Sequence, residues 1–207
     1  MIEDLAAIAV HATPVRPGDV GAIEAQLGRR PRGLVGIGAR CACGAPAVTV
    51  TEPRLPDGTP FPTLFYLTLP SVVYGMSRLE AEGRMAELNA RLAEDAGLAA
   101  GHRAAHADYI ERRRLLGDVP EIANVSVGGM PDRVKCLHAL AAYSMSVGEG
   151  VCPVGDLALR AAAWDPAVCR CGENAQRNVP GAQTGVSGGQ SVASGGEGAQ
   201  SVLGRAE

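Results

Sequence analysis

Three stretches decide the fold: Leu34–Ala39 (LVGIGA), Ala47–Thr51 (AVTVT) and Thr63–Thr68 (TLFYLT). The second alternates Val with Thr, as a half-buried strand does, and the third is rich in residues that favour strands. The loop between the second and third stretches contains Pro56–Gly58 (PDG), a strong turn sequence. The pattern predicts an antiparallel three-stranded meander.

Helical patterns lie on both sides of these strands. Asp19 is a candidate cap for a helix over 20–27, and Gly28 ends it. From Ser71 onward apolar residues recur at helical spacing, with breaks at Gly83 and Gly97. Further helices are expected over 98–116, 131–146 and 156–163. The fold class is therefore α+β, with a small antiparallel sheet followed by several helices that pack against it.

The chain of 207 residues suits one domain with tails. We expect a loose lead-in over 1–17 and a single α+β domain over 18–165. From 166 to 207 the sequence becomes rich in Gly and Ser, which cannot bury enough apolar surface to offset chain entropy. That composition predicts a disordered tail.

Charge and hydropathy exclude two partner classes. The net charge of −3 gives no basic footprint for nucleic acid. No stretch approaches the roughly 18 apolar residues of a membrane span. Glu3 and Asp4 stand where a signal peptide needs positive charge, so we expect a cytoplasmic protein. Its six cysteines are then more simply thiols or metal ligands than disulfides.

A second stretch, Gly128–His138 (GGMPDRVKCLH), brings several charged and reactive side chains close together in the sequence. Pro131 suits a first helical turn, which predicts a helix starting there. Lys135 is the only lysine among 19 basic residues. A helix N-terminus after two glycines is suited to binding an anion.

The predicted ligand-binding residues are Gly128, Gly129, Arg133 and Lys135, with Arg54 from the loop before the third strand. The two glycines would let an anion approach the backbone, and the three cations would add charge. The alternative is a glycine-rich loop that enters a core helix and carries two solvated cations. The sequence leaves these two interpretations open.

The acid/base candidates are His138, His106 and Asp57. On a helix from Pro131, His138 shares a face with Lys135, while Cys136 points to nearly the opposite side and is most simply a core thiol. A satisfied core histidine is a slightly better interpretation of His138 than a catalytic one.

His106 lies four residues after His102, which is half of a zincin pattern. Ala105 stands where the catalytic glutamate would be, so that chemistry is disfavoured. Asp57 belongs first of all to the turn, although the stiff, proline-rich loop could position it beside Arg54 as an acid/base group.

Two Cys-x-Cys-Gly pairs, at Cys41 and Cys43 and at Cys169 and Cys171, offer four thiolates. Four thiolates complete a tetrahedral zinc site. The usual spacing has two intervening residues, and the second pair borders the predicted tail. Zinc is the one cofactor the sequence suggests, but the sequence favours the metal-free alternative, a tight turn with incidental cysteines.

Three segments together resemble DUF501, an actinobacterial family of unknown function: Pro53–Thr63, Ala104–His106 and Gly128–His138. The resemblance runs from about Gly18 to Ala163. It implies a small cytoplasmic protein with no assigned reaction, often encoded near a septum-formation protein and an exopolyphosphatase. Where the family usually has Asn before a Pro-x-Gly-Asp segment, this chain has Cys152. The family pattern does not cover the second Cys-x-Cys pair.

The favoured function is binding of a small anionic, phosphorylated ligand, with turnover as an extension. The alternative is a non-enzymatic interaction module linked to cell division, with an unidentified protein partner and any Cys-bound zinc structural. An enzyme should bring Arg54, Asp57, His106, Lys135 and His138 around one pocket, whereas a module should scatter them.

Overall fold

The structure is a computed structural model, and it describes residues 5–171. Strands β1 (Leu34–Arg40), β2 (Pro46–Thr51) and β3 (Phe65–Leu67) form one antiparallel sheet in the order β1-β2-β3. In the register, Leu34 lies opposite Thr51, and Val50 lies opposite Phe65. The predicted meander and the α+β class are confirmed.

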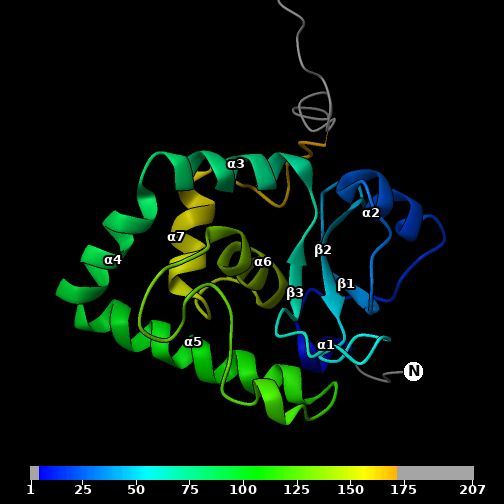
Figure 1. Ribbon diagram of the computed structural model, residues 1–207. Helices are drawn as coiled ribbons and strands as arrows, with labels where there is room; N and C mark the ends of the chain where they lie inside the picture. The colour runs from blue at the N-terminus through cyan, green and yellow to red at the C-terminus, as the bar shows by residue number, and fades with distance from the viewer. Residues whose placement is uncertain (1–4, 172–207) are drawn as a thin grey trace, which may run out of the picture.

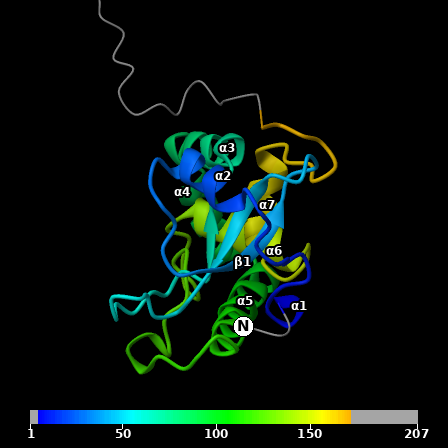
Figure 2. The same ribbon diagram turned by 90° about the vertical axis from the view of Figure 1, so that its right-hand side faces the viewer.

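Helices pack against this sheet and against one another. In Figure 1, α6 lies at the centre beside the sheet, with α3 along one end of the molecule and α5 along the other. Helix α2 lies on the opposite side of the sheet, which the turned view in Figure 2 also shows. The bounds are α1 (Leu5–Ile8), α2 (Asp19–Leu27), α3 (Pro70–Ala81), α4 (Arg84–Glu94), α5 (Ala96–Arg114), the 3-10 turn η1 (Pro120–Ile122), α6 (Leu137–Val147) and α7 (Pro153–Ala161).

Helix α6 is a core helix, because nearly all of its residues are buried rather than one face. Its Tyr143 ring meets Phe65 from β3 at 5.8 Å and Tyr109 from α5 at 5.0 Å between ring centres. The Tyr109 hydroxyl accepts the N–H of Leu64 at 2.6 Å. This aromatic cluster joins the sheet to two helices.

Helices α6 and α7 are in backbone contact. A Cβ at Gly155 would lie 2.3 Å from the carbonyl oxygen of Leu140, so only glycine fits there. One residue on, Asp156 accepts hydrogen bonds from the Ser144 hydroxyl and, at 2.8 Å, from the N–H of Gly150. The Gly-Asp pair therefore fixes α7 on α6.

The segment before α2, where the sequence predicted a loose lead-in, packs on the domain. Ile8 and Ala9 are fully buried. Thr13 and Ile37 exchange backbone hydrogen bonds of 2.8 and 2.9 Å along β1. Asp19, predicted to cap α2, forms an ion pair with Arg40 instead.

The predicted disordered tail lies almost entirely outside the described residues, because the description ends at Cys171. Among residues 5–171, none of the helices combines the length and the apolar character that a bilayer crossing requires.

We expect Gly155→Ala to destabilise the protein by about 1–3 kcal/mol, because the added methyl group would force α7 away from α6. The matched control is Gly21→Ala in α2, where a Cβ would meet nothing within 4 Å. That change should stabilise the protein by roughly 0.5–1 kcal/mol. Urea unfolding of both variants measures the difference, and a neutral Gly155→Ala would show that the helices can separate without loss.

Candidate functional site

The two glycines of the GGMPDRVKCLH stretch close a loop ahead of α6. The carbonyl oxygen of Gly128 accepts hydrogen bonds from the N–H groups of Lys135 at 2.6 Å and Cys136 at 3.3 Å. Gly128 and Gly129 have φ angles of 67° and 95°, and a Cβ at Gly129 would lie 2.6 Å from the carbonyl oxygen of Arg133. This path requires glycine.

Helix α6 begins at Leu137, so the predicted start at Pro131 is wrong. The reason is a side chain on α4: Asn89 accepts the N–H of Val134 at 2.8 Å and donates to its carbonyl oxygen at 2.9 Å. These are backbone groups that a helix would need. Cys136 is consequently extended, with φ −151° and ψ 115°.

The start of α6 already carries a negative charge. The N–H of Leu137 donates to Oε1 of Glu80 on α3, at 2.7 Å. A carboxylate suits the positive end of a helix and satisfies one of its free N–H groups. The helix N-terminus that the sequence offered to an anionic ligand is therefore occupied by the protein itself.

The same carboxylate holds His138. Its Nδ1 lies 3.1 Å from Oε1 of Glu80 and 4.0 Å from Sγ of Cys136, while Nε2 lies 3.2 Å from the carbonyl oxygen of Val73. The hydrogen bond with Cys136 and the charge of Glu80 raise the pKa of His138 against the opposing effect of burial. His138 thus ties α6 to α3 through Glu80 and Val73.

The late helix start also changes the geometry of the motif. Cys136 and His138, predicted on opposite sides, lie on the same side and form with Glu80 a group of three possible metal ligands. Sequence reasoning missed Glu80 because no local pattern links it to a histidine 58 positions away.

The structure brings four predicted ligand-binding residues together: Gly128, Gly129, Arg133 and Lys135 line one open groove of about 710 Å³. We call it the loop groove; its lining is residues 124–130 with Asp132, Arg133 and Lys135. Arg133 and Lys135 are exposed, and among residues 5–171 neither forms an ion pair.

Two histidines of α5 lie behind this loop. His106 Nδ1 is 2.8 Å from the hydroxyl of Ser126, which lines the loop groove. His102 is fully buried, with Nε2 3.2 Å from the carbonyl oxygen of Arg133, and burial lowers its pKa. The two therefore support the loop at different points.

Arg54 and Asp57 lie apart from the loop groove. Arg54 pairs with both oxygens of Glu121, at 2.8 and 2.7 Å. Asp57 accepts the N–H of Thr59 at 3.0 Å and pairs with Arg32 at 3.3 Å. These contacts complete the turn before β3, so the predicted anion-binding and acid/base residues are divided among the loop groove with His106 behind it, the Glu80–His138 pair and this turn.

The four cysteines of the two Cys-x-Cys pairs converge, although they come from the β1–β2 turn and from the segment after α7. Their sulfur atoms all lie within 4.8 Å of one another, and we call them the thiol cluster: Cys41, Cys43, Cys169 and Cys171. Within this cluster, burial acts to raise the pKa of Cys41, but hydrogen bonds to backbone N–H groups and to the neighbouring thiols lower it; the contacts with Cys41 and Cys43 in turn raise the pKa of Cys169 and Cys171.

A family model described as a protein of unknown function, DUF501, matches residues 37–160. The chain belongs to the DUF501 family. The match includes the loop groove, Glu80 and His138, and it ends before Cys169 and Cys171. Neither a search of curated proteins nor one of solved structures gave a match.

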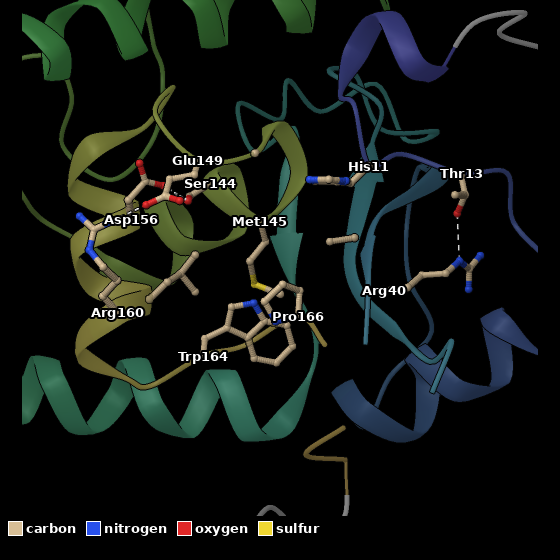
Figure 3. Close-up of a pocket in the computed structure, with 13 residues that line it drawn as sticks. His11, Thr13, Arg40, Ser144, Met145, Glu149, Asp156, Arg160, Trp164 and Pro166 are labelled. Carbon is tan, nitrogen blue, oxygen red and sulfur yellow. Dashed lines mark hydrogen bonds and ion pairs between the residues drawn. The ribbon is translucent and has the colours of Figure 1, made fainter. Parts of the chain in front are cut away.

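This DUF501 chain has a second hollow, a cleft of about 450 Å³ between β1 and the α6–α7 pair. Figure 3 shows Met145, Trp164 and Pro166 at its centre, with His11 pointing inward. Its charged groups are paired within the protein; Arg160, for example, contacts Glu149 at 2.6 Å. The cleft is therefore mainly an apolar surface.

The Glu80–His138 pair predicts a pH dependence. Because the pKa of His138 is raised above 6.5, its stabilisation is complete below that pH and is lost as the pH rises through the folded-state pKa. His138→Gln should lower the free energy of unfolding by up to about 1 kcal/mol near pH 5.5 and by less near pH 9.

Urea unfolding at both pH values tests this expectation. The control is His11→Gln, because His11 has no acidic partner within 4 Å among residues 5–171. A loss that is equal at the two pH values would contradict an ion pair at His138.

Proposed function

We propose that the protein binds a small anionic, phosphorylated ligand in the loop groove. The observation that carries the proposal is that Arg133 and Lys135 line one groove without an ion-pair partner among the described residues. Several other cations of the described chain, such as Arg40 and Arg112, are bonded to carboxylates.

The chemistry of the groove suits a phosphate group. The planar guanidinium of Arg133 can hold two phosphate oxygens, and the ammonium of Lys135 acts as a compact point charge. Gly128 and Gly129 also line the groove, so no side chain of theirs blocks the approach of an anion to the backbone. The bound anion is placed at the loop and not at the start of α6.

Binding without turnover is the better supported form of this proposal. A catalytic acid or base must reach the reacting group. His138 is held by Glu80, Asp57 belongs to a turn outside the groove lining, and His106 meets the groove only through Ser126. The proposal places the protein in the cytoplasm, where phosphorylated metabolites occur. The five residues that an enzyme should gather around one pocket are scattered, which is the arrangement expected for the alternative, a non-enzymatic interaction module. A link of such a module to cell division stays a prediction.

The lone lysine gives the test. Ligand-induced melting shifts are measured with inorganic phosphate, pyrophosphate, polyphosphate and a panel of phosphorylated metabolites. Lys135→Met should weaken binding by about 10- to 100-fold, because a charged hydrogen bond is lost. Lys135→Arg should retain most of the affinity, because the positive charge remains.

The matched control is Arg160→Met, which removes an exposed cation at the cleft and should leave the shifts unchanged. Trp164 lines the cleft and is the only tryptophan, so its fluorescence reports a ligand bound there. Equal shifts in wild type and both Lys135 variants, or quenching of Trp164 by the anion, would remove the loop groove as the site.

A further inference from the structure

From the sequence alone, a metal-free turn was the favoured interpretation of the two Cys-x-Cys pairs. In the structure the thiol cluster has the composition of a metal centre. We propose that Cys41, Cys43, Cys169 and Cys171 bind one Zn²⁺ as a structural site. This inference is independent of the loop groove. It concerns two segments that lie far apart in the chain, since Cys43 and Cys171 are separated by 128 positions and their sulfurs by 3.3 Å.

The distances fit a tetrahedral ion. With a Zn–S bond of about 2.3 Å, the sulfurs of a tetrahedral site lie roughly 3.8 Å apart. The four sulfurs of the thiol cluster lie within 4.8 Å of one another, so small side-chain adjustments suffice. Binding displaces the thiol protons into solvent and leaves four thiolates on the metal.

The β1–β2 turn that carries the first cysteine pair is tight. The N–H of Gly44 donates to the carbonyl oxygen of Cys41 at 2.7 Å, and Gly44 has a φ of 89°, a backbone conformation that favours glycine. The turn therefore holds Cys41 and Cys43 together at one end of the sheet, where their sulfurs meet those of Cys169 and Cys171.

The ligand set indicates zinc and a structural role. Soft thiolates select zinc over magnesium or calcium, which take oxygen ligands. Four protein ligands fill the tetrahedral shell and leave no open position for a substrate. Because Cys169 and Cys171 lie beyond the family match, the complete site is assigned to this chain and not to DUF501 proteins in general.

The metal would fasten one wall of the cleft. Trp164 and Pro166 line the cleft just before the second cysteine pair, and Arg40 lines it just before the first. In Figure 3 the Trp164 and Pro166 rings lie across the cleft from β1. A bond between the two cysteine pairs therefore holds the segment after α7 against the β1–β2 turn.

Metal content tests the site directly. Protein purified under reducing conditions without chelator should carry about one zinc ion per chain, as measured by elemental mass spectrometry. Co²⁺ added to the metal-free protein should give the intense visible absorption of a tetrahedral thiolate complex. Cys43→Ser and Cys169→Ser, which change exposed side chains, should each lose the zinc and weaken that absorption.

The matched control is Cys136→Ser, which changes the other group of possible ligands, Glu80, Cys136 and His138. It should leave the zinc content and the cobalt spectrum unchanged. Loss of metal in Cys136→Ser with retention in Cys43→Ser would move the site and overturn the proposal. Reduced wild-type protein that takes up neither zinc nor cobalt would also overturn it.

The stabilisation of the segment after α7 by the metal can be measured separately. Removal of zinc by a chelator should lower the melting temperature by roughly 5–10 °C, as expected for loss of a ligand present well above its dissociation constant. It should also shift the emission of Trp164 to longer wavelength as the cleft wall loosens. Cys169→Ser should match the chelated wild type in both measurements and not respond to chelator. A wild type insensitive to chelator would contradict the structural role.

Discussion

The burial of α6 is the constraint on which the rest of the structure depends. Its residues contact the sheet, α3 and α7, so each neighbour must fit a helix that has no solvent face. Backbone contact with α7 requires Gly155, and the aromatic cluster requires Tyr143 to meet two rings at once. A buried helix end also needs partners for its free N–H groups, which Glu80 provides.

That requirement distinguishes polar groups that are bonded within the protein from those that the fold leaves unpaired. Glu80, His138 and Asn89 complete the start of α6 and the loop before it. The side chains of Arg133 and Lys135, on the same loop, line the loop groove and form no ion pair among residues 5–171. The anion-binding proposal uses this unpaired charge.

The sequence predicted those features that local patterns determine. Alternation in Ala47–Thr51 and the turn at Pro56–Gly58 were enough for the meander. The start of α6 could not be predicted, because Asn89 acts on Val134 from 45 positions away. The repeated Cys-x-Cys pairs were visible, yet their convergence depends on how α7 packs, which no local pattern contains.

The loop groove and the thiol cluster occupy opposite ends of the molecule. In Figure 1 the loop before α6 lies toward α5, whereas the segment after Trp164 lies at the end of the molecule where α3 runs, and Figure 2 agrees. Both sites are built on connecting segments, where change disturbs core packing least. The family match includes the first and ends before the second cysteine pair. One buried core thus carries two separate proposed sites: anion binding at the loop before α6, and metal binding where the chain leaves the last helix.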